Sequence, residues 1–282
     1  MIISEAYELY EEDKKLLNYS QYTLKAYRIQ SNLLIRYLDD VNIKSIETIN
    51  LKKYLISQKH LKPSSISHRI RFLKSFFRHL QEEGLLTNNP SSKLKEPKEG
   101  FRIPKFLTEE EIEFLRIGCK KTVDYALLEF LFSTGVRIGE AYNLKLTDIN
   151  LENRSAIIQG KGNKQREIYF NLKCKIWLKK YLEQRKDKLS VDYVFITERK
   201  PYRRMSISQL RWITKRIARQ SEININVYPH RYRHSYAMTL LNRRMPIEMI
   251  QSLLGHQKLE TTKIYAQLSG QRRKEEYDRY SM

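Results

Sequence analysis

Apolar residues recur at helical spacing through the first 90 residues of the chain. One segment begins at a Pro-Ser-Ser triplet, stops at Gly84, and has apolar positions three or four residues apart, which is the period of an amphipathic helix. Those positions are Ile66, Ile70, Leu73, Phe77 and Leu80. A segment from Thr23 repeats the arrangement, and the residues expected inside are Leu24, Tyr27, Leu34, Tyr37 and Leu38. The first part of the chain therefore predicts a small helical bundle.

A boundary between two parts of the chain is predicted within residues 88–105. This stretch holds three prolines, one glycine and five lysines or arginines, with little apolar periodicity, which is typical of a linker. We therefore assign residues 1–90 to a helical domain and residues 91–105 to an interdomain linker. Residues 106–268 are assigned to a second domain, and residues 269–282 to a C-terminal tail.

The second domain is expected to combine helices with a small sheet. Thr108 stands three residues before Glu111, which is the spacing of a capping box at the start of a helix. Residues 155–170 hold a short apolar strand, a Gly-Lys-Gly-Asn turn and a second, alternating strand, and this pattern predicts a β-hairpin. The predicted fold class is mainly α with a small antiparallel β-sheet.

The charge of the chain points to a polyanionic partner. Its 282 residues carry 53 Lys plus Arg against 32 Asp plus Glu, a net charge of +21, while 41% hydrophobic residues suffice for a folded core. Residues 1–99 have 17 bases against 12 acids, and residues 100–282 have 36 against 20. Because both parts are basic, phosphates of a nucleic acid contacted from two sides are the simplest partner. The alternative is that the cations only keep the protein soluble.

Several other classes of protein are excluded by the same sequence. No apolar stretch approaches the roughly 20 residues that a membrane span requires, and the acidic start of the chain lacks the pattern of an export signal. The two cysteines, Cys119 and Cys174, are too few for a disulfide framework or a zinc cluster. We expect a cytoplasmic protein without membrane association.

The helix predicted after position 63 has one basic face. Its cations, on the side opposite the apolar positions, are Arg69, Arg71, Lys74 and Arg78, next to His68. This face is a candidate DNA contact, and the alternative is an ordinary solvated surface.

Three short sequence patterns contain the residues whose side chains could take part in catalysis. TGVRIGEA surrounds Arg137, PHRYRHSYA contains His230 and Arg233, and LLGHQKLETTKIYAQ contains His256 and Tyr265. A proline at position 229 suits the first residue of a helix, so His230 and Arg233, three residues apart, share one helix face and can share a ligand. A glycine at position 255 suits a helix C-cap, which would hold His256 at a defined exit point.

Together with the lysine turn, these patterns resemble the tyrosine recombinase (phage integrase) family over essentially the whole chain. The active residues of that family fall, in order, on Arg137, Lys161, His230, Arg233, His256 and Tyr265. The text around them, such as GKGNKQR and LLGH, is similar as well, and SQYTLKAYR and NPSSKLKEPK are similar to parts of the family's helical core-binding domain. Within the family, the chain is most similar to Xer-like or small mobile-element recombinases.

The resemblance implies a reaction in which Tyr265 attacks a DNA phosphate and forms a 3′-phosphotyrosyl bond. The residue types suit this reaction, since Arg137 and Arg233 can donate paired hydrogen bonds to the nonbridging oxygens of the transition state. Lys161 is the expected general acid for the 5′ hydroxyl leaving group. His230 and His256 are expected to move protons or bind the phosphate. No metal or other cofactor is expected, because guanidinium groups take that role.

Other polar residues near these patterns have supporting assignments. Glu140, three residues after Arg137, is expected to orient that arginine or His230, whereas His234 is assigned to supporting the helix. Candidates for DNA backbone contacts, with plain solvation as the alternative, are Lys164, Arg166, Arg231, Arg243 and Arg244.

The resemblance also implies partners. We expect double-stranded DNA with inverted-repeat core sites, a DNA-bound tetramer in which strands are exchanged through a Holliday junction, and nucleoid association. In the family a C-terminal segment packs into the neighbouring protomer, and residues 269–282 are the candidate here, with a disordered tail as the alternative. An accessory protein is a further possible partner that the sequence does not identify.

Two other functions remain open at this point. A type IB topoisomerase uses a similar residue set but rejoins the strand it cleaves, and a DNA-binding regulator would use the same surfaces without chemistry. Among recombinases, the sequence leaves open replicon dimer resolution, cointegrate resolution and integration or excision of a mobile element. The length, 282 residues, leaves no room for an additional arm-binding domain.

Overall fold

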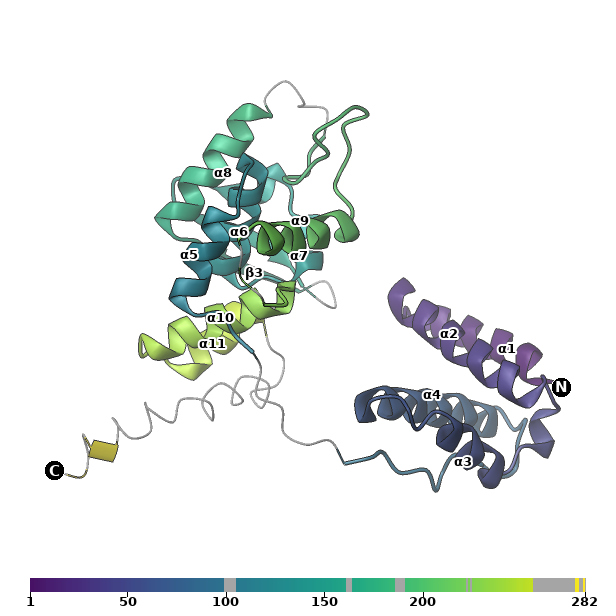
Figure 1. The fold of residues 1–282 in the computed structure, drawn as a ribbon. Helices are drawn as coiled ribbons and strands as arrows, with labels where there is room; N and C mark the ends of the chain where they lie inside the picture. The colour runs from purple at the N-terminus through teal and green to yellow at the C-terminus, as the bar shows by residue number, and fades with distance from the viewer. Residues whose placement is uncertain are drawn as a thin grey trace. The chain divides into compact units, whose positions relative to one another are not determined.

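The chain divides into two compact units, Met1–Phe101 and Arg102–Met282, each of which is described by itself. In this computed structural model, the described residues are 1–98, 105–160, 164–185, 191–221, 223, 225–255, 277–278 and 281. Helices dominate both units (Figure 1). The domain limits drawn from the sequence stay a prediction.

The first unit is a bundle of helices around its own apolar core. Its elements are α1 (Ile3–Leu16), α2 (Gln21–Leu38), a short 3₁₀ helix (Ile43–Ser45), α3 (Thr48–Ser57) and α4 (Pro63–Glu82). α1 packs against both α2 and α4. Aromatic rings fill much of the core, with Phe72 and Phe76 stacked at 5.8 Å between ring centroids and Tyr10 meeting both rings edge-on.

The amphipathic helix predicted after position 63 is confirmed. α4 begins with Pro63 in its first position, and Gly84 follows its end with a φ of 70°. Of the five predicted inward residues, Ile66 is partly buried and the other four are buried in the core. In α2, Leu24 and Leu34 are buried, but the prediction for Tyr37 is wrong, because its ring lies over Tyr54 at the surface and is 40% exposed.

The first residues of the predicted linker lie against the first unit. Ser91 and Leu94 are both buried, and Leu94 belongs to the same core as α1 and α4. Thr48, the first residue of α3, donates from Oγ1 to the carbonyl oxygen of Pro90 at 2.8 Å. The chain is therefore anchored on this unit as far as Leu94.

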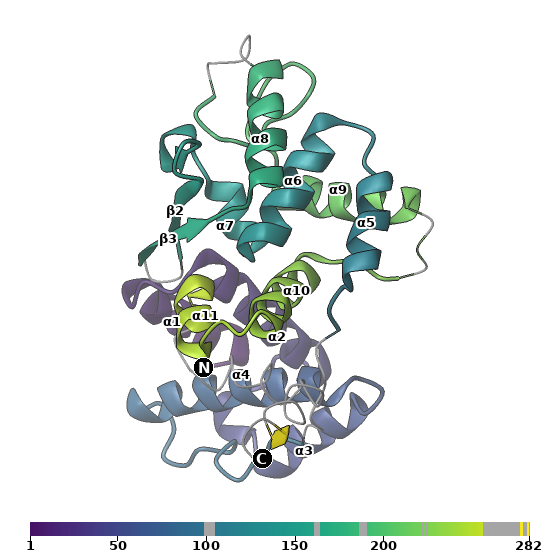
Figure 2. The same cartoon turned by 90° about the vertical axis from the view of Figure 1, so that its left-hand side faces the viewer.

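The second unit is built around the apolar helix α6. Its helices are α5 (Glu109–Ile117), α6 (Thr122–Thr134), α7 (Ile138–Asn143), a 3₁₀ helix (Leu146–Asp148), α8 (Leu172–Gln184), α9 (Ile207–Gln220), α10 (Pro229–Asn242) and α11 (Ile247–Leu254). α6 contacts α8, α9 and α10 (Figures 1 and 2). Almost every residue along it is buried. The capping box predicted at Thr108 is confirmed, because Thr108 and Glu111 exchange side-chain to main-chain hydrogen bonds of 2.8 and 3.1 Å.

A small antiparallel sheet lies beside these helices, as predicted. Its strands, in the order β1-β2-β3, are β1 (Ile149–Asn150), β2 (Ser155–Gln159) and β3 (Gln165–Tyr169). In the hairpin, Ser155 pairs with Tyr169 and Gln159 with Gln165. Ala156, Ile158 and Ile168 are buried, as the alternation of the sequence requires.

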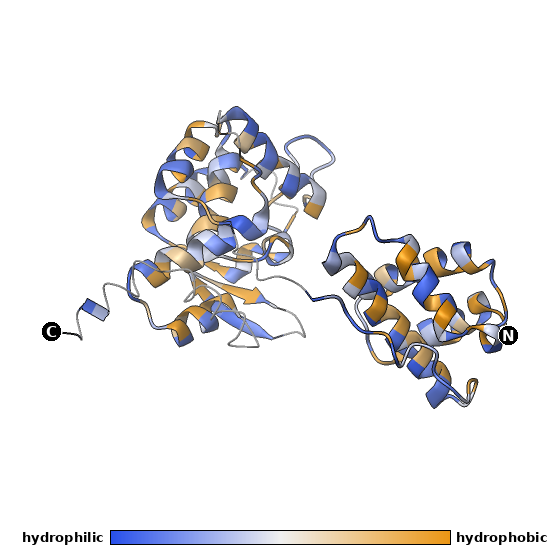
Figure 3. Ribbon diagram, turned by 60° about the horizontal axis from the view of Figure 1, so that its bottom comes forward, coloured by the Kyte–Doolittle hydropathy of each residue, from blue (hydrophilic) through white to orange (hydrophobic). Residues whose placement is uncertain are grey.

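Apolar and polar residues alternate along most of the described helices (Figure 3). This is the distribution expected for helices with one buried face. Within the described part of the chain, no helix has both the length and the apolar character needed to cross a membrane.

Candidate active site

Arg137 is positioned by a turn that requires glycine. α6 ends at Thr134, and Gly135 then adopts a left-handed conformation with a φ of 61°. A Cβ atom on Gly135 would lie 2.4 Å from Cδ1 of Tyr236, so a larger residue does not fit. Two residues later Arg137 caps the start of α7, where its side chain is 38% exposed and faces solvent in part.

Glu140 holds Arg137 by both its main chain and its side chain. The main-chain N–H of Arg137 donates to Oε2 of Glu140 at 2.8 Å, and Nη1 of Arg137 donates to Oε1 at 2.9 Å. These contacts are the ones that the predicted orienting role of Glu140 requires, and the role itself stays a prediction. Because the carboxylate is almost fully buried, it fixes the arginine from the inside of the domain.

The His-x-x-Arg pattern lies on the first turn of α10. Pro229 occupies the first position of the helix, as expected, and His230 follows at a solvent-accessible position. Arg233 is buried and donates to two main-chain carbonyl oxygens, that of Gly135 at 2.8 Å and that of Leu254 at 2.6 Å. Arg233 therefore joins α10 to the turn before Arg137 and to the end of α11.

The surroundings of His230 favour its neutral form. Partial burial lowers the pKa of the imidazole, and the charges of Arg233, Arg137 and Arg211 lower it further. A neutral imidazole can accept a proton or a hydrogen bond at neutral pH. The neighbouring His234 has its pKa lowered to about 4 by burial, then by His230 and Arg233. Arg137, His230 and Arg233 thus come within electrostatic reach of one another although they belong to two helices.

Glu140 stays ionised in spite of its burial. Burial alone would raise the pKa of this carboxyl group, but hydrogen bonds and charge from Arg166, together with Arg137, lower it below the ordinary value. Nη1 and Nη2 of Arg166 donate to the two carboxylate oxygens at 3.0 and 2.8 Å. Glu140 is therefore shared between Arg137 on α7 and Arg166 on β3.

Three of the six predicted catalytic residues, Lys161, His256 and Tyr265, lie outside the described residues. The same holds for residues 269–276 of the tail. Gly160 ends the described part of the hairpin before Lys161, and Gly255 caps α11 with a φ of 63° immediately before position 256. Among the described residues, no group of three His, Cys, Asp or Glu side chains could hold a metal ion.

The predicted DNA-binding cations of α4 differ in their surroundings. Arg69 donates to the hydroxyl of Tyr54 at 2.6 Å, and Arg71 pairs with Glu96 through two hydrogen bonds of 3.0 and 2.7 Å. Lys74 is partly exposed, whereas Arg78 is exposed near the end of the helix. Their contact with DNA stays a prediction.

The candidates in the second unit also divide into exposed and buried side chains. Lys164, Arg243 and Arg244 are exposed. Arg231 is buried and donates to the carbonyl oxygens of Asn226 and Phe106 at 3.1 and 3.3 Å. The structure thus places Arg231 in contacts that hold the start of α10, as it places Arg166 in contacts with Glu140; for both, a DNA contact remains a prediction.

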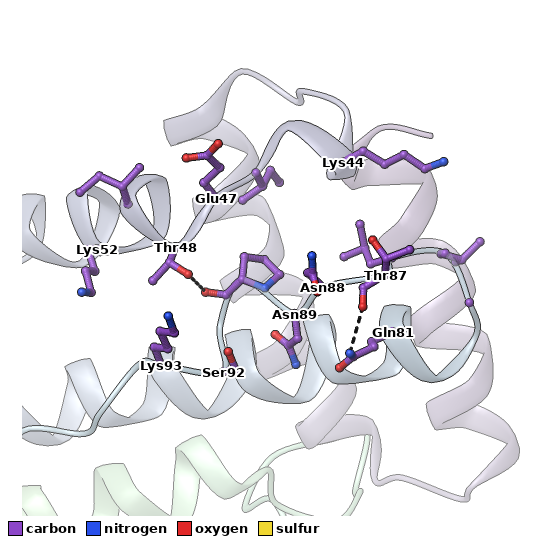
Figure 4. A pocket seen from close by; sticks show the side chains of 16 residues that line it. Lys44, Glu47, Thr48, Lys52, Gln81, Thr87, Asn88, Asn89, Ser92 and Lys93 are labelled. Atoms are coloured by element: carbon purple, nitrogen blue, oxygen red, sulfur yellow. Dashed lines mark hydrogen bonds between the residues drawn. The ribbon is translucent and has the colours of Figure 1, made fainter.

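Sequence reasoning missed two features of the described residues, one in each unit. Arg211, on α9, contributes to the lowered pKa of His230, and no local pattern marks it as part of the site. In the first unit, a hollow of about 1060 Å³ is lined by Lys44, Lys52 and Lys93 beside Thr48 and Gln81 (Figure 4). These lysines come from separate segments, so only folding brings them to one hollow.

The family comparisons cover both units. Residues 105–272 match the phage integrase family, and residues 10–84 match the phage integrase N-terminal SAM-like domain. The chain is 32% identical to the tyrosine recombinase XerC of Oceanobacillus iheyensis over 92% of its own length and 90% of the relative's. It is 30% identical to XerC of Staphylococcus aureus, with the same shares covered.

Solved structures share the fold of the chain. A XerA recombinase is 26% identical and covers 99% of this chain and 98% of its own, with a TM-score of 0.57. A XerH site-specific recombinase bound to a palindromic difH substrate has a TM-score of 0.77 at 22% identity, over 98% of this chain and 85% of its own. A lambda integrase dimer bound to a core site has a TM-score of 0.76 at 20% identity, over 92% of this chain and 96% of its own.

Proposed function

From the premise that this chain belongs to the phage integrase family and is a tyrosine recombinase, we propose that Tyr265 is its nucleophile. The phenol oxygen attacks a phosphate of double-stranded DNA, the bond to the 5′ oxygen breaks, and a 3′-phosphotyrosyl bond forms. A 5′ hydroxyl from another strand then attacks this bond and releases the tyrosine. Because one phosphodiester bond is exchanged for another, the site-specific recombination needs no ATP.

The arginines supply the electrostatic part of the mechanism. Arg137 and Arg233 donate to the nonbridging phosphate oxygens, whose charge increases in the transition state. A phenol with a pKa near 10 is a weak nucleophile when neutral, so cations around the phosphate lower the barrier for its attack. Glu140 orients Arg137 and does not contact the DNA.

Proton transfer is assigned to the lysine and the two histidines. Lys161 donates a proton to the departing 5′ oxygen, because an alkoxide leaving group is strongly disfavoured. His230, held in its neutral form by its surroundings, accepts the proton that the Tyr265 phenol loses on attack. His256 donates a hydrogen bond to the phosphate.

One observation carries this proposal, namely the convergence of Arg137 and the His230–Arg233 pair. Arg233 bonds to the turn that presents Arg137, and the charges of both arginines act on His230. A partly exposed cation, Arg137, and a buried one, Arg233, both within electrostatic reach of a neutral imidazole, suit a phosphate undergoing in-line displacement. If the ion pair of Arg137 and Glu140 were only structural, the Arg137 side chain would not need to be partly exposed.

The proposed partners follow from the reaction. Recombination needs two DNA sites and four strand cleavages, so we propose that four protomers assemble on inverted-repeat core sites and pass through a Holliday junction. A lambda integrase with the same fold has been solved as a tetramer bound to a Holliday junction. We place the protein in the cytoplasm, on the nucleoid, and assign the tail 269–282 to contacts with the neighbouring protomer.

The experiment that tests the nucleophile uses wild-type and Tyr265→Phe protein. Both are incubated with fragmented bacterial and plasmid DNA without divalent metal, and denatured. DNA that remains bound to protein is recovered and its attached 3′ ends are sequenced. We expect reproducible ends with the wild type and none with the variant, which also identifies the site. Linked DNA from the Phe variant would show that another residue is the nucleophile.

A second experiment tests the tail. Truncation after Ser269 is expected to leave binding to a single site unchanged and to weaken the synapsis of two sites. Gel retardation and recombination between two sites on one plasmid measure these two properties. Unchanged recombination by the truncated protein would show that the tail has no such role.

A further inference from the structure

The side chain of Arg166 donates its hydrogen bonds to groups inside the second unit. Its Nη1 and Nη2 donate to the two oxygens of Glu140, and its Nε donates to the carbonyl oxygen of Leu253 at 3.0 Å. The side chain is only 13% exposed. One guanidinium group on β3 therefore bonds to α7 and to the end of α11 at the same time.

Two glycines lie next to this side chain. A Cβ atom on Gly255 would lie 3.1 Å from Cδ and Nη1 of Arg166, and one on Gly160 would lie 3.4 Å from Nη1. A Cβ atom at 3.1 Å would require Arg166 to give by a few tenths of an ångström, and the φ of 63° at Gly255 itself favours glycine. In the sequence, Gly160 directly precedes Lys161 and Gly255 directly precedes His256.

Glu140 connects Arg166 to the arginine of the active site. The carboxylate is 5% exposed and accepts hydrogen bonds from Arg166 and from Arg137. A buried carboxylate that loses its main cationic partner takes up a proton or moves towards water. Either change would weaken its bond to Nη1 of Arg137 and release that side chain.

We propose that Arg166 is a positioning residue for DNA cleavage, which holds Glu140 in place so that Glu140 can fix the guanidinium of Arg137 against the scissile phosphate. The inference rests on the proposed function of Arg137. It differs from a direct DNA contact, because the hydrogen bonds of Arg166 run into the domain and its effect on the phosphate passes through Glu140.

The test measures single-turnover formation of the covalent complex on a duplex that carries the site recovered with the wild-type protein. DNA is saturating, so the rate reports the chemical step, and gel retardation measures affinity separately. The variants are Arg166→Met, Glu140→Gln, the double variant and Arg166→Lys, which keeps a cation beside Glu140. The thermal unfolding midpoint of each protein is measured in the same buffer.

The expected results separate positioning from stability. Arg166→Met slows cleavage by about 100-fold, the scale of a misplaced catalytic group, while its affinity for DNA stays at the wild-type value. The double variant has no unpaired buried charge, so its midpoint recovers towards the wild type, but its cleavage stays as slow as that of Arg166→Met. Arg166→Lys recovers part of the rate.

A matched control uses another arginine of the same unit. Arg116 is 16% exposed and pairs with the buried Glu129 at 2.5 and 3.1 Å, on α5 and α6. Arg116→Met is expected to lower the unfolding midpoint about as much as Arg166→Met and to leave the cleavage rate unchanged. The control shows whether loss of a desolvated ion pair is itself enough to slow the reaction.

Four results would overturn the inference. The first two are cleavage by Arg166→Met at the wild-type rate and equal losses of cleavage rate and DNA affinity in that variant. The third is a cleavage rate of the double variant that recovers together with its unfolding midpoint. The fourth is a loss of cleavage rate in Arg116→Met equal to that in Arg166→Met. If instead the wild-type protein forms no covalent complex, the proposed function itself fails and the role of Arg166 in cleavage fails with it, which distinguishes this case from the four results above.

Discussion

Arg233 donates from Nη1 to the carbonyl oxygen of Gly135 at 2.8 Å, across 98 positions of sequence. The bond joins the first turn of α10 to the left-handed turn that ends α6 and leads to Arg137. Both groups are buried. Because a rigid main-chain acceptor holds the guanidinium plane, Arg233 is fixed relative to the turn before Arg137 in the absence of a ligand. This is the condition for the electrostatic preorganisation that the proposed function requires.

We predict that Gly135→Ala destabilises the protein and disturbs the active site. The substitution places a Cβ atom 2.4 Å from Tyr236 and forces alanine into a φ of 61°. The backbone strain alone costs about 1–3 kcal/mol, and the collision with the ring adds to it. Urea unfolding measures the loss, which is expected to exceed 2 kcal/mol, about the middle of that range.

Two other glycines separate strain from collision. Gly84 has a φ of 70° but open space around its Cα, so Gly84→Ala is expected to show the strain alone. Gly139 lies in α7 with nothing within 4 Å of a Cβ atom, so Gly139→Ala is expected to be neutral or to stabilise by up to about 1 kcal/mol. If the free energy of unfolding fell by the same amount in all three variants, the collision with Tyr236 would not contribute to the loss in Gly135→Ala.

The lowered pKa of His234 predicts a loss of stability in mild acid. Its pKa is about 4 in the folded protein against 6.5 for the free side chain, so the unfolded state binds a proton first as the pH falls. The contribution of this residue to the free energy of unfolding is complete above pH 6.5 and is lost progressively down to pH 4. The loss reaches about 2 kcal/mol by pH 5.

The measurement compares wild-type and His234→Gln protein at pH 7.5 and pH 5. Glutamine does not titrate, so the free energy of unfolding of the variant should fall less between the two values. Carboxyl groups with a lowered pKa, such as Glu140, also contribute less to stability in acid. They are present in both proteins, so their contributions cancel in the comparison. Equal losses in the two proteins would contradict the burial of His234 as the cause.

Both cysteines are predicted to resist alkylation in the folded protein. Burial raises the pKa of the Cys174 thiol to about 12, and it raises that of Cys119 as well. Since the thiolate is the reactive form, neither thiol should react with iodoacetamide at pH 8 until the second unit unfolds. Mass spectrometry should find both residues labelled in guanidinium chloride. Rapid labelling of either residue under native conditions would contradict the packing around it.

The exposed cations of α4 predict a salt-dependent contribution to DNA affinity. Removal of one phosphate contact by Arg78→Ala should reduce the slope of log affinity against log salt by about 0.9 and weaken all DNA sequences alike. Lys53→Ala, at an exposed position on α3, is the control with the same change of charge. A slope unchanged by Arg78→Ala, or changed equally by Lys53→Ala, would remove α4 from the DNA interface.

The first unit is predicted to fold without the second. Its core, including Phe76, Leu80 and Leu94, is made from residues 1–98 alone. A protein of residues 1–98 should show helical circular dichroism and a cooperative urea transition, and Phe76→Ala should lower its stability by about 3–5 kcal/mol. A gradual loss of helix without a cooperative transition would show that this unit needs the rest of the chain.

Local chemistry made much of the fold predictable from the sequence. The start of α4 at Pro63, the capping box at Thr108 and the end of α11 at Gly255 each depend on a few neighbouring residues. The hairpin likewise follows from alternation around a glycine turn. Tyr37 was the exception, because the period places it inward and only the surrounding helices decide how far the core extends.

The order and spacing of the chemical motifs determined the family, while the contacts that organise the site depended on tertiary structure. Arg166 stands 26 positions from Glu140, and Arg233 stands 98 from Gly135. A charged residue in a strand or helix can face solvent, DNA or a buried partner with the same local pattern. The packing of α6, α7, α10, α11 and the hairpin against one another selects the buried partner, since an ion removed from water must be paired where it lies.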